Sequence, residues 1–180
     1  MRGRLIAVVG PSGVGKDSVM SGIARADPTY RRVRRTITRA PGLGGEDYAA
    51  LTPEAFETAR RGGAFCLHWG AHDLHYGIPV QTLEDVRNGA DCLANLSRAV
   101  LKQANEVFPA LTVLNLTASP ETLAHRLRDR GRESPPEIAR RLARTANPMP
   151  AGLTVITLAN DGPLDQTVAA ALSALDPERV

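Results

Sequence analysis

The sequence predicts an α/β fold in which a parallel sheet lies between two layers of helices. Four short apolar runs have the length and composition of buried strands: residues 5–9, 92–96, 111–116 and 153–158. Helical patterns lie between and after them: residues 17–25, 98–107, 120–130, 135–146 and 163–175. Strands that alternate with helices form parallel sheets whose two faces are both covered. Ligands of such sheets bind at the carboxyl ends of the strands, and we expect the functional site there.

The segment from about residue 31 to residue 79 interrupts this alternation. It contains a turn-rich run at residues 41–45, a short helical pattern at residues 53–61 and β-like pieces around residues 65–69. Thr52 and Pro53 are typical of the cap and first turn of a helix. We expect this segment to be a small insertion that stands over the carboxyl edge of the sheet.

Length and composition restrict the class of protein. With 180 residues and 43% apolar content, the chain suits one buried core, so we expect a single domain over residues 1–180. No window holds 18 consecutive apolar residues, which predicts no membrane span and no membrane partner. The chain begins in a strand pattern without a cleavable signal, and its two cysteines, Cys66 and Cys92, lack the spacing of metal ligands. These features predict a cytoplasmic enzyme.

The positive charge comes almost entirely from arginine. Among 22 basic residues, only Lys16 and Lys102 are lysines, and the arginines cluster within residues 31–39 and 126–144. Codon bias explains part of this excess, and the planar guanidinium fork suits phosphate oxygens. Nucleic acid is not the expected partner, because aromatic residues make up 4% of the chain and none form a stacking platform beside the arginines.

A phosphate-binding loop follows the first predicted strand. Its residues are Gly10, Pro11, Ser12, Gly13, Val14, Gly15, Lys16, Asp17 and Ser18. Glycines allow backbone N–H groups to surround phosphates closely, and the helix that begins near Lys16 adds its positive N-terminal end. The lysine supplies a cation to the β- and γ-phosphates, so the loop predicts ATP binding.

The loop departs from its usual pattern at one position. Asp17 stands where a Ser or Thr normally follows the lysine, and the hydroxyl comes one residue later, at Ser18. Two interpretations of Asp17 remain open. It holds Mg²⁺ through water with Ser18 supplying the hydroxyl, or it is a carboxylate that stabilises a helix N-terminus.

Several short motifs, in this order, resemble the guanylate kinase family of nucleoside monophosphate kinases over nearly the whole chain. They are the phosphate loop, Thr36-Ile37-Thr38-Arg39, Gly45-Glu46-Asp47-Tyr48, residues 65–69 with Tyr76-Gly77, Arg126-Leu127, Arg130-Gly131-Arg132-Glu133 and Asn160-Asp161-Gly162. The resemblance implies a three-layer fold of the P-loop NTPase type, with an acceptor-binding insertion at about residues 31–79 and a helical lid at about residues 126–144. It further implies that Asn160 and Asp161 lie beside the adenine of ATP.

The departures from that family lie mainly where it recognises guanine. His68 replaces a glutamate, Arg35 replaces a serine, Gly42 replaces an arginine, and the strand at residues 92–96 lacks its expected acidic residues. A histidine and an arginine do not supply the acceptors that guanine N–H groups need, so GMP is not the expected acceptor. We find no sequence-based reason for Gly42.

A group within the family fits these departures. The Gly15-Lys16-Asp17-Ser18 ending, the Ile37-Thr38-Arg39 run, the Ser97-Arg98 pair and the Arg130 to Glu133 segment resemble ribose 1,5-bisphosphate phosphokinases of bacterial phosphonate breakdown. That resemblance implies transfer of a phosphoryl group from ATP to ribose 1,5-bisphosphate, which gives 5-phosphoribosyl 1-diphosphate (PRPP). An acceptor with two phosphates and no base agrees with arginines in place of carboxylates.

The resemblance also suggests roles for individual residues. The expected acceptor-binding residues are Arg35, Arg39, Tyr48, His68, Tyr76, Ser97 and Arg98. Within the lid, which also carries Arg126 and Arg132, we expect Arg130 and Arg141 to close over the transferred phosphoryl group; a solvated basic helix face is the alternative. For His68, a satisfied histidine without a substrate role is nearly as well supported.

Two other functions remain open from the sequence. One is guanylate kinase activity, and the other is a non-catalytic guanylate kinase-like binding module, against which Lys16 and the loop glycines argue. The oligomeric state is left open between a monomer and a homodimer.

Overall fold

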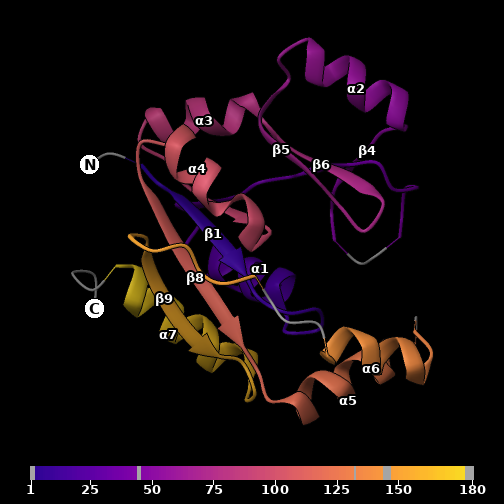
Figure 1. The fold of residues 1–180 in the computed structure, drawn as a ribbon. Coiled ribbons are helices and arrows are strands. Elements are labelled where there is room, and N and C mark those ends of the chain that lie inside the picture. Colours follow the sequence, from indigo (N-terminus) through magenta and orange to yellow (C-terminus); the bar gives the residue numbers. More distant parts are fainter. Residues whose placement is uncertain (1–2, 44–45, 132, 144–146, 177–180) are drawn as a thin grey trace.

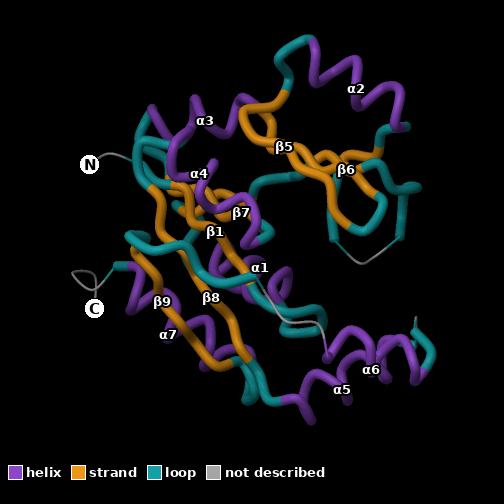
Figure 2. Tube along the Cα trace, viewed as in Figure 1, coloured by secondary structure: helices purple, strands orange, loops and turns teal. Residues whose placement is uncertain are grey.

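Strand β1 (Leu5–Val9) is the central strand of a five-stranded parallel sheet (Figures 1 and 2). The computed structural model describes residues 3–43, 46–131, 133–143 and 147–176. The strand order is β2-β7-β1-β8-β9. The other four strands are β2 (Tyr30–Arg32), β7 (Asp91–Asn95), β8 (Leu111–Thr117) and β9 (Thr154–Ala159).

Alternate residues of β1 enter two separate cores. Leu5, Ala7 and Val9 pack in one cluster, which is covered by α3 (Val80–Arg87) and α4 (Leu101–Val107). Ile6 and Val8 pack in the other cluster, with residues of α1 (Lys16–Ala26) and α7 (Leu164–Leu175). A strand that is apolar on both faces must be covered on both faces. The predicted α/β fold with three layers is therefore confirmed.

A second sheet of four strands lies between β2 and α3 in the chain. Its order is β4-β3-β6-β5, and only the β3–β4 pair is parallel. The strands are β3 (Thr36–Ile37), β4 (Ala49–Ala50), β5 (Phe65–Ala71) and β6 (Leu74–Pro79). Helix α2 (Pro53–Arg61) packs on it by stacking Phe56 against Phe65 at 4.7 Å between ring centroids.

The segment expected to form the lid contains parts of two helices, α5 (Pro120–Arg130) and α6 (Pro135–Ala143). The pattern at residues 135–146 predicts three more residues for the second helix, but 144–146 lie outside the described residues, as do Gly44, Gly45 and Arg132. The helical pattern at residues 98–107 is split into a 3₁₀ turn, η1 (Arg98–Val100), and α4.

Several elements have no clear signal in the sequence. Strands β2, β3 and β4 contain only two or three residues, too few for a hydrophobic period to show. Helix α3 lacks a side-chain cap and buries only Thr82 and Val86. Since β2 pairs with β7, residues 31 and 32 belong to the main sheet, and the second sheet begins at Thr36.

The structure supplies a reason for Gly42. Its φ is +76°, in the left-handed region, and nothing lies within 4 Å of the position where a Cβ would stand. Backbone conformation therefore favours glycine here, rather than space or a ligand contact. An arginine at this position would be strained.

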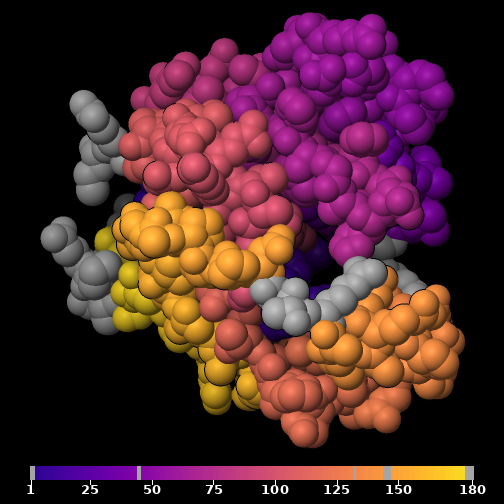
Figure 3. Space-filling model, viewed as in Figure 1, coloured from indigo at the N-terminus to yellow at the C-terminus, as the bar shows by residue number. Residues whose placement is uncertain are grey.

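The carboxyl ends of β1, β7, β8 and β9 meet at one edge of the main sheet (Figure 1). The second sheet stands on one side of this edge and the helices α5 and α6 on the other. The space-filling view shows a hollow between these two bodies, with atoms of the N-terminal part of the chain at its floor (Figure 3). Within the described residues, no helix has the length and apolarity required to cross a membrane.

The two-sided core predicts where substitutions destabilise the fold. Leu114 is fully buried, so Leu114→Ala removes packed methyl groups and should lower the free energy of unfolding by about 2–5 kcal/mol. Val155 is 37% exposed on β9, and Val155→Ala should cost less than about 1 kcal/mol. Urea denaturation measures both values, and equal losses would contradict this assignment of the core.

Candidate active site

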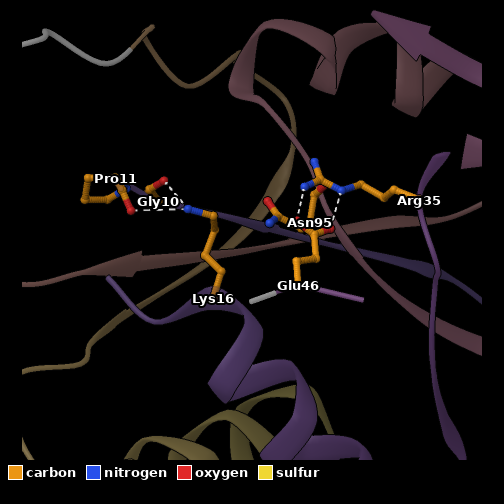
Figure 4. Close-up of polar contacts among 6 residues, drawn as sticks. All are labelled: Gly10, Pro11, Lys16, Arg35, Glu46 and Asn95. Carbon is orange, nitrogen blue, oxygen red and sulfur yellow. Dashed lines mark hydrogen bonds and ion pairs between the residues drawn. The ribbon is translucent and has the colours of Figure 1, made fainter. Parts of the chain in front are cut away.

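The loop between β1 and α1 has the conformation that phosphate binding requires. Gly10, Gly13 and Gly15 have φ values of +155°, +85° and +98°, as the sequence motif predicts. The Lys16 ammonium donates hydrogen bonds to the carbonyl oxygens of Gly10 at 2.9 Å and Pro11 at 3.2 Å (Figure 4). The lysine therefore lies along its own loop, at the N-terminus of α1.

Burial affects the two charged groups that begin α1. Desolvation lowers the pKa of Lys16 to about 8, against a smaller opposing effect of Asp17. Desolvation raises the pKa of Asp17, and the nearby Glu46 carboxylate raises it further. These shifts identify a partly desolvated site that holds charges of both signs.

Asp17 has an unusual contact pattern. Its Oδ1 atom is buried and has no hydrogen-bond partner. A buried carboxylate oxygen without a partner is unfavourable, and a cation would satisfy it. Ser18 follows on α1 with an exposed side chain. Throughout the part of the chain that the structure describes, no group of three or more His, Cys, Asp or Glu residues is arranged to hold a metal.

The Val14 carbonyl is the point at which the loop is fastened to the fold. It accepts a hydrogen bond from Asn160 Nδ2 at 2.7 Å and another from Arg126 Nη1 at 3.2 Å. Asn160 is 4% exposed, and its Oδ1 accepts a hydrogen bond from Thr167. Asn160 therefore supports the phosphate loop through both ends of its amide, and the expected position beside adenine stays a prediction. A Cβ at Gly15 would stand 2.8 Å from Asn160 Nδ2.

Asp161, in contrast, lines a shallow open groove of about 420 Å³ with Arg126, His125, Thr122 and Glu121. The Ser119 backbone N–H donates to Asp161 Oδ1 at 2.8 Å, and this hydrogen bond lowers the pKa of Asp161. The groove lies between α5 and the turn after β9, beside the phosphate loop that Arg126 contacts.

Arg35 precedes β3, in the segment expected to bind the acceptor, and is held by protein groups. Its Nε and Nη2 atoms donate to the two Glu46 carboxylate oxygens at 2.7 and 2.6 Å, and its Nη1 donates to the Asn95 carbonyl at 3.0 Å (Figure 4). The Tyr76 ring centroid lies 5.1 Å from the guanidinium carbon. These contacts use three of the five guanidinium N–H groups, so Arg35 is held by the protein, and its role as a phosphate fork stays a prediction.

The two aromatic predictions on this side have different surroundings. The Tyr76 ring stacks on Trp69 at 5.3 Å between centroids. Arg39 lies over the Tyr48 ring at 5.6 Å, and the Tyr48 hydroxyl donates to the Ala40 carbonyl. Arg39 is thus positioned by an aromatic ring, and it makes no ion pair with a carboxylate of the described residues.

His68 lies on the opposite face of the second sheet. Side chains alternate along β5, and Trp69 shares the face of Tyr76 and Arg35. His68 is exposed and lines a small depression with Phe56, Glu57, Arg60 and His75, on the side that α2 covers. The structure therefore separates His68 from Arg35 and Tyr76, which favours the interpretation without a substrate role.

Ser97 and Arg98 follow β7, as the sequence predicts. The Ser97 hydroxyl accepts a hydrogen bond from the Ala99 N–H at 3.3 Å and caps η1. Arg98 Nη2 donates to Asn115 Oδ1 at 2.8 Å, so its side chain lies across the carboxyl edge toward β8. Asn115 pairs in register with Val9, the last residue before the phosphate loop.

The lid arginines converge on a single carboxylate. Glu133 Oε1 lies 2.5 Å from Arg130 Nη2 and 3.3 Å from Arg141 Nη2. Arg141 Nη1 also donates to the Ser12 hydroxyl of the phosphate loop at 2.6 Å. The predicted residues Arg130 and Arg141 are thus together, and one of them already contacts the loop.

Two residues at the centre of these contacts, Glu46 and Glu133, were assigned no role from the sequence. Each lies in a motif that carries the family resemblance, but neither stands at a position with a recognisable pattern of its own. For Glu133 the available signal was an acidic residue within the arginine-rich segment 126–144. Glu46 lies outside both arginine clusters, and only its contact with Arg35 in the fold shows its importance.

The structure resembles solved kinases. It superposes on a guanylate kinase from Anaplasma phagocytophilum with a TM-score of 0.68, at 19% identity, covering 99% of this chain and 88% of that one. A gluconokinase from Sinorhizobium meliloti 1021 matches with a TM-score of 0.59, at 20% identity, covering 98% of this chain and 93% of that one. At these identities the likeness establishes the fold.

Sequence relatives are much closer, although no family model matches the chain. The ribose 1,5-bisphosphate phosphokinase PhnN of Ruegeria sp. (strain TM1040) is 51% identical, covering 99% of this chain and 94% of its own length. The protein of that name from Pseudomonas paraeruginosa (strain DSM 24068 / PA7) is 47% identical over 99% of this chain and 98% of its length. A bifunctional ribose 1,5-bisphosphokinase-thymidine phosphorylase of Cupriavidus pinatubonensis is 42% identical over 96% of this chain, which spans 29% of that protein. The chain belongs to the ribose 1,5-bisphosphate phosphokinase family.

Proposed function

We propose that this protein transfers the γ-phosphoryl group of ATP to the 1-phosphate of ribose 1,5-bisphosphate, which gives PRPP and ADP. The observation that carries the proposal is an intact Lys16 loop below two converging lid arginines, in a chain of this family. In the transfer, a 1-phosphate oxygen forms a bond to the γ-phosphorus as the bond to the β,γ-bridging oxygen breaks. The acceptor oxygen is already ionised, so the reaction requires no general base.

The protein's own contribution is position and positive charge. Lys16 would leave the carbonyls of Gly10 and Pro11 for the β- and γ-phosphates. Arg130 and Arg141 would exchange part of their contact with Glu133 for the migrating phosphoryl group. Closure of the lid would exclude water and suppress hydrolysis of ATP.

Adenine fits the groove beside Asp161 and Arg126, whose planar guanidinium suits a stacked base. On the other side of the loop, Arg39 with Tyr48, Tyr76, and Arg98 with Ser97 would hold the acceptor and its phosphates. Arg35 is not included in this set because Glu46 and the Asn95 carbonyl already hold it. His68 is not included because it lies on the opposite face of the second sheet.

Mg²⁺ would be held by the partnerless Asp17 carboxylate oxygen, through water, together with the Ser18 hydroxyl. When bound, such a cation neutralises charge on the β- and γ-phosphate oxygens. The alternative, that Asp17 is only a carboxylate at a helix N-terminus, predicts no effect on the magnesium requirement.

A coupled ADP-release assay with separate acceptors tests the proposed activity. We expect turnover with ribose 1,5-bisphosphate and at least 100-fold lower kcat/KM with GMP, since a base-reading hydrogen bond network is missing. Lys16→Ala should lower kcat by about 1000-fold or more and serves as the inactive control. Turnover with GMP alone would identify a guanylate kinase, and no turnover with either acceptor would favour a binding module.

Asp17→Ser tests the magnesium assignment. The variant restores the usual hydroxyl, so we expect ATP binding within about threefold of the parent and a shift in the Mg²⁺ concentration that gives half-maximal rate. Titration of Mg²⁺ at saturating ATP measures this concentration. An unchanged magnesium curve would assign Asp17 to the helix terminus alone.

The low pKa of Lys16 predicts a pH effect on nucleotide binding. The free protein loses the Lys16 proton as pH rises through about 8, whereas bound phosphates favour the protonated lysine. The Kd for ATP should therefore rise by about tenfold between pH 7.5 and pH 9. Calorimetric titration measures it, with Lys16→Met as the control that should show weak, pH-independent binding. A constant Kd in the parent would contradict the shift.

A further inference from the structure

Among the ion pairs of the described residues, the Arg35–Glu46 pair is the one in which both side chains are almost fully buried. The two side chains are 8% and 10% exposed, and two parallel hydrogen bonds join them. The neighbouring pair, Arg34 with Asp47, has side chains that are 60% and 72% exposed. A buried arginine–carboxylate pair therefore lies next in sequence to an exposed arginine–carboxylate pair.

The buried pair reaches the edge where the reaction is proposed to occur. Arg35 donates to the Asn95 carbonyl at the end of β7, and Asn95 pairs in register with Val8 of β1. Glu46 is close enough to influence the titration of both Lys16 and Asp17. In Figure 4, Lys16 points to Gly10 and Pro11, and the Arg35–Glu46–Asn95 group lies on its other side.

A carboxylate at this place is chemically selective. Each carboxylate oxygen of Glu46 has the capacity to accept more than one hydrogen bond, and Arg35 donates only one to each. The remaining acceptor positions attract hydroxyl groups and repel phosphate oxygens. The proposed acceptor is anionic at both ends and carries its hydroxyl groups between them.

We propose that Glu46, oriented by Arg35, is a specificity-determining residue that accepts hydrogen bonds from the hydroxyl groups of the acceptor sugar. Arg35 is then a positioning residue that fixes the carboxylate without meeting the substrate. This inference rests on the proposed function, because it assigns a role within the same acceptor site.

The test pairs a change in the protein with a change in the acceptor. With ribose 1,5-bisphosphate, Glu46→Gln should lower kcat/KM by about 10- to 100-fold, the range expected for loss of a hydrogen bond to a charged group. The 2-deoxy and 3-deoxy forms of the acceptor are tested in the same way. With the one that lacks the hydroxyl contacted by Glu46, the same substitution should change kcat/KM by less than about threefold. The KM for ATP should stay within about twofold.

The matched control is Asp47→Asn, which removes the exposed carboxylate next to Glu46 and should leave every acceptor unchanged. Equal losses with ribose and both deoxy acceptors would overturn the proposal and make Glu46 purely structural. A rise in the KM for ATP or in the magnesium requirement alone would also overturn it.

A second variant guards against misfolding. Arg35→Met with Glu46→Leu removes both charges, so no unpaired charge is left buried. It should show the same loss of discrimination between ribose and the deoxy sugars, with a cooperative thermal transition.

Two outcomes separate the hypotheses. If the parent does not use ribose 1,5-bisphosphate at all, the proposed function fails. If the parent uses it and the variants keep their discrimination, only the role of Glu46 fails.

Discussion

The hydrogen bonds to the Val14 carbonyl connect the phosphate loop to the rest of the site. Asn160 brings the end of β9 to this oxygen, and Arg126 brings α5 to it. Val14 itself is fully buried, so the loop cannot shift without disturbing the core. One backbone carbonyl therefore fixes the phosphate loop that carries Lys16 relative to the end of β9 and to α5.

Charge is balanced within the protein on both sides of this loop. Glu46 holds Arg35 on the acceptor side, and Glu133 holds Arg130 and Arg141 on the lid side. Closely spaced guanidinium groups repel one another, and carboxylates reduce that cost. The two sides differ in burial: Arg35 is enclosed, whereas Arg141 has a side chain 41% exposed. Arg141 can therefore exchange Glu133 for a substrate phosphate more easily than Arg35 can exchange Glu46.

Much of the main sheet and of the loop could be predicted from local patterns. Apolar runs mark β1, β7 and β8 because these strands are mostly buried on both faces, and a similar run marks β9 at the more exposed edge of the sheet. The loop glycines have the positive φ values that their spacing indicates. The second sheet was harder, since β3 and β4 contain two residues each. The partner of Arg35 and the face of His68 could not be predicted, because they depend on how the loop at Glu46 packs and on the register of β5 with β6.

By itself, the sequence determined the order of the main elements, the phosphate-binding loop, the nature of its cation and the family of the chain. These features reside in contiguous residues, where spacing and side-chain type are sufficient. Tertiary structure alone decided which polar groups are already satisfied. Asn160 supports the loop, Arg35 is held by Glu46, and Glu133 contacts both Arg130 and Arg141. Partners distant in sequence meet only when the sheet and helices pack, and their hydrogen bonds then determine which charges remain for the substrate.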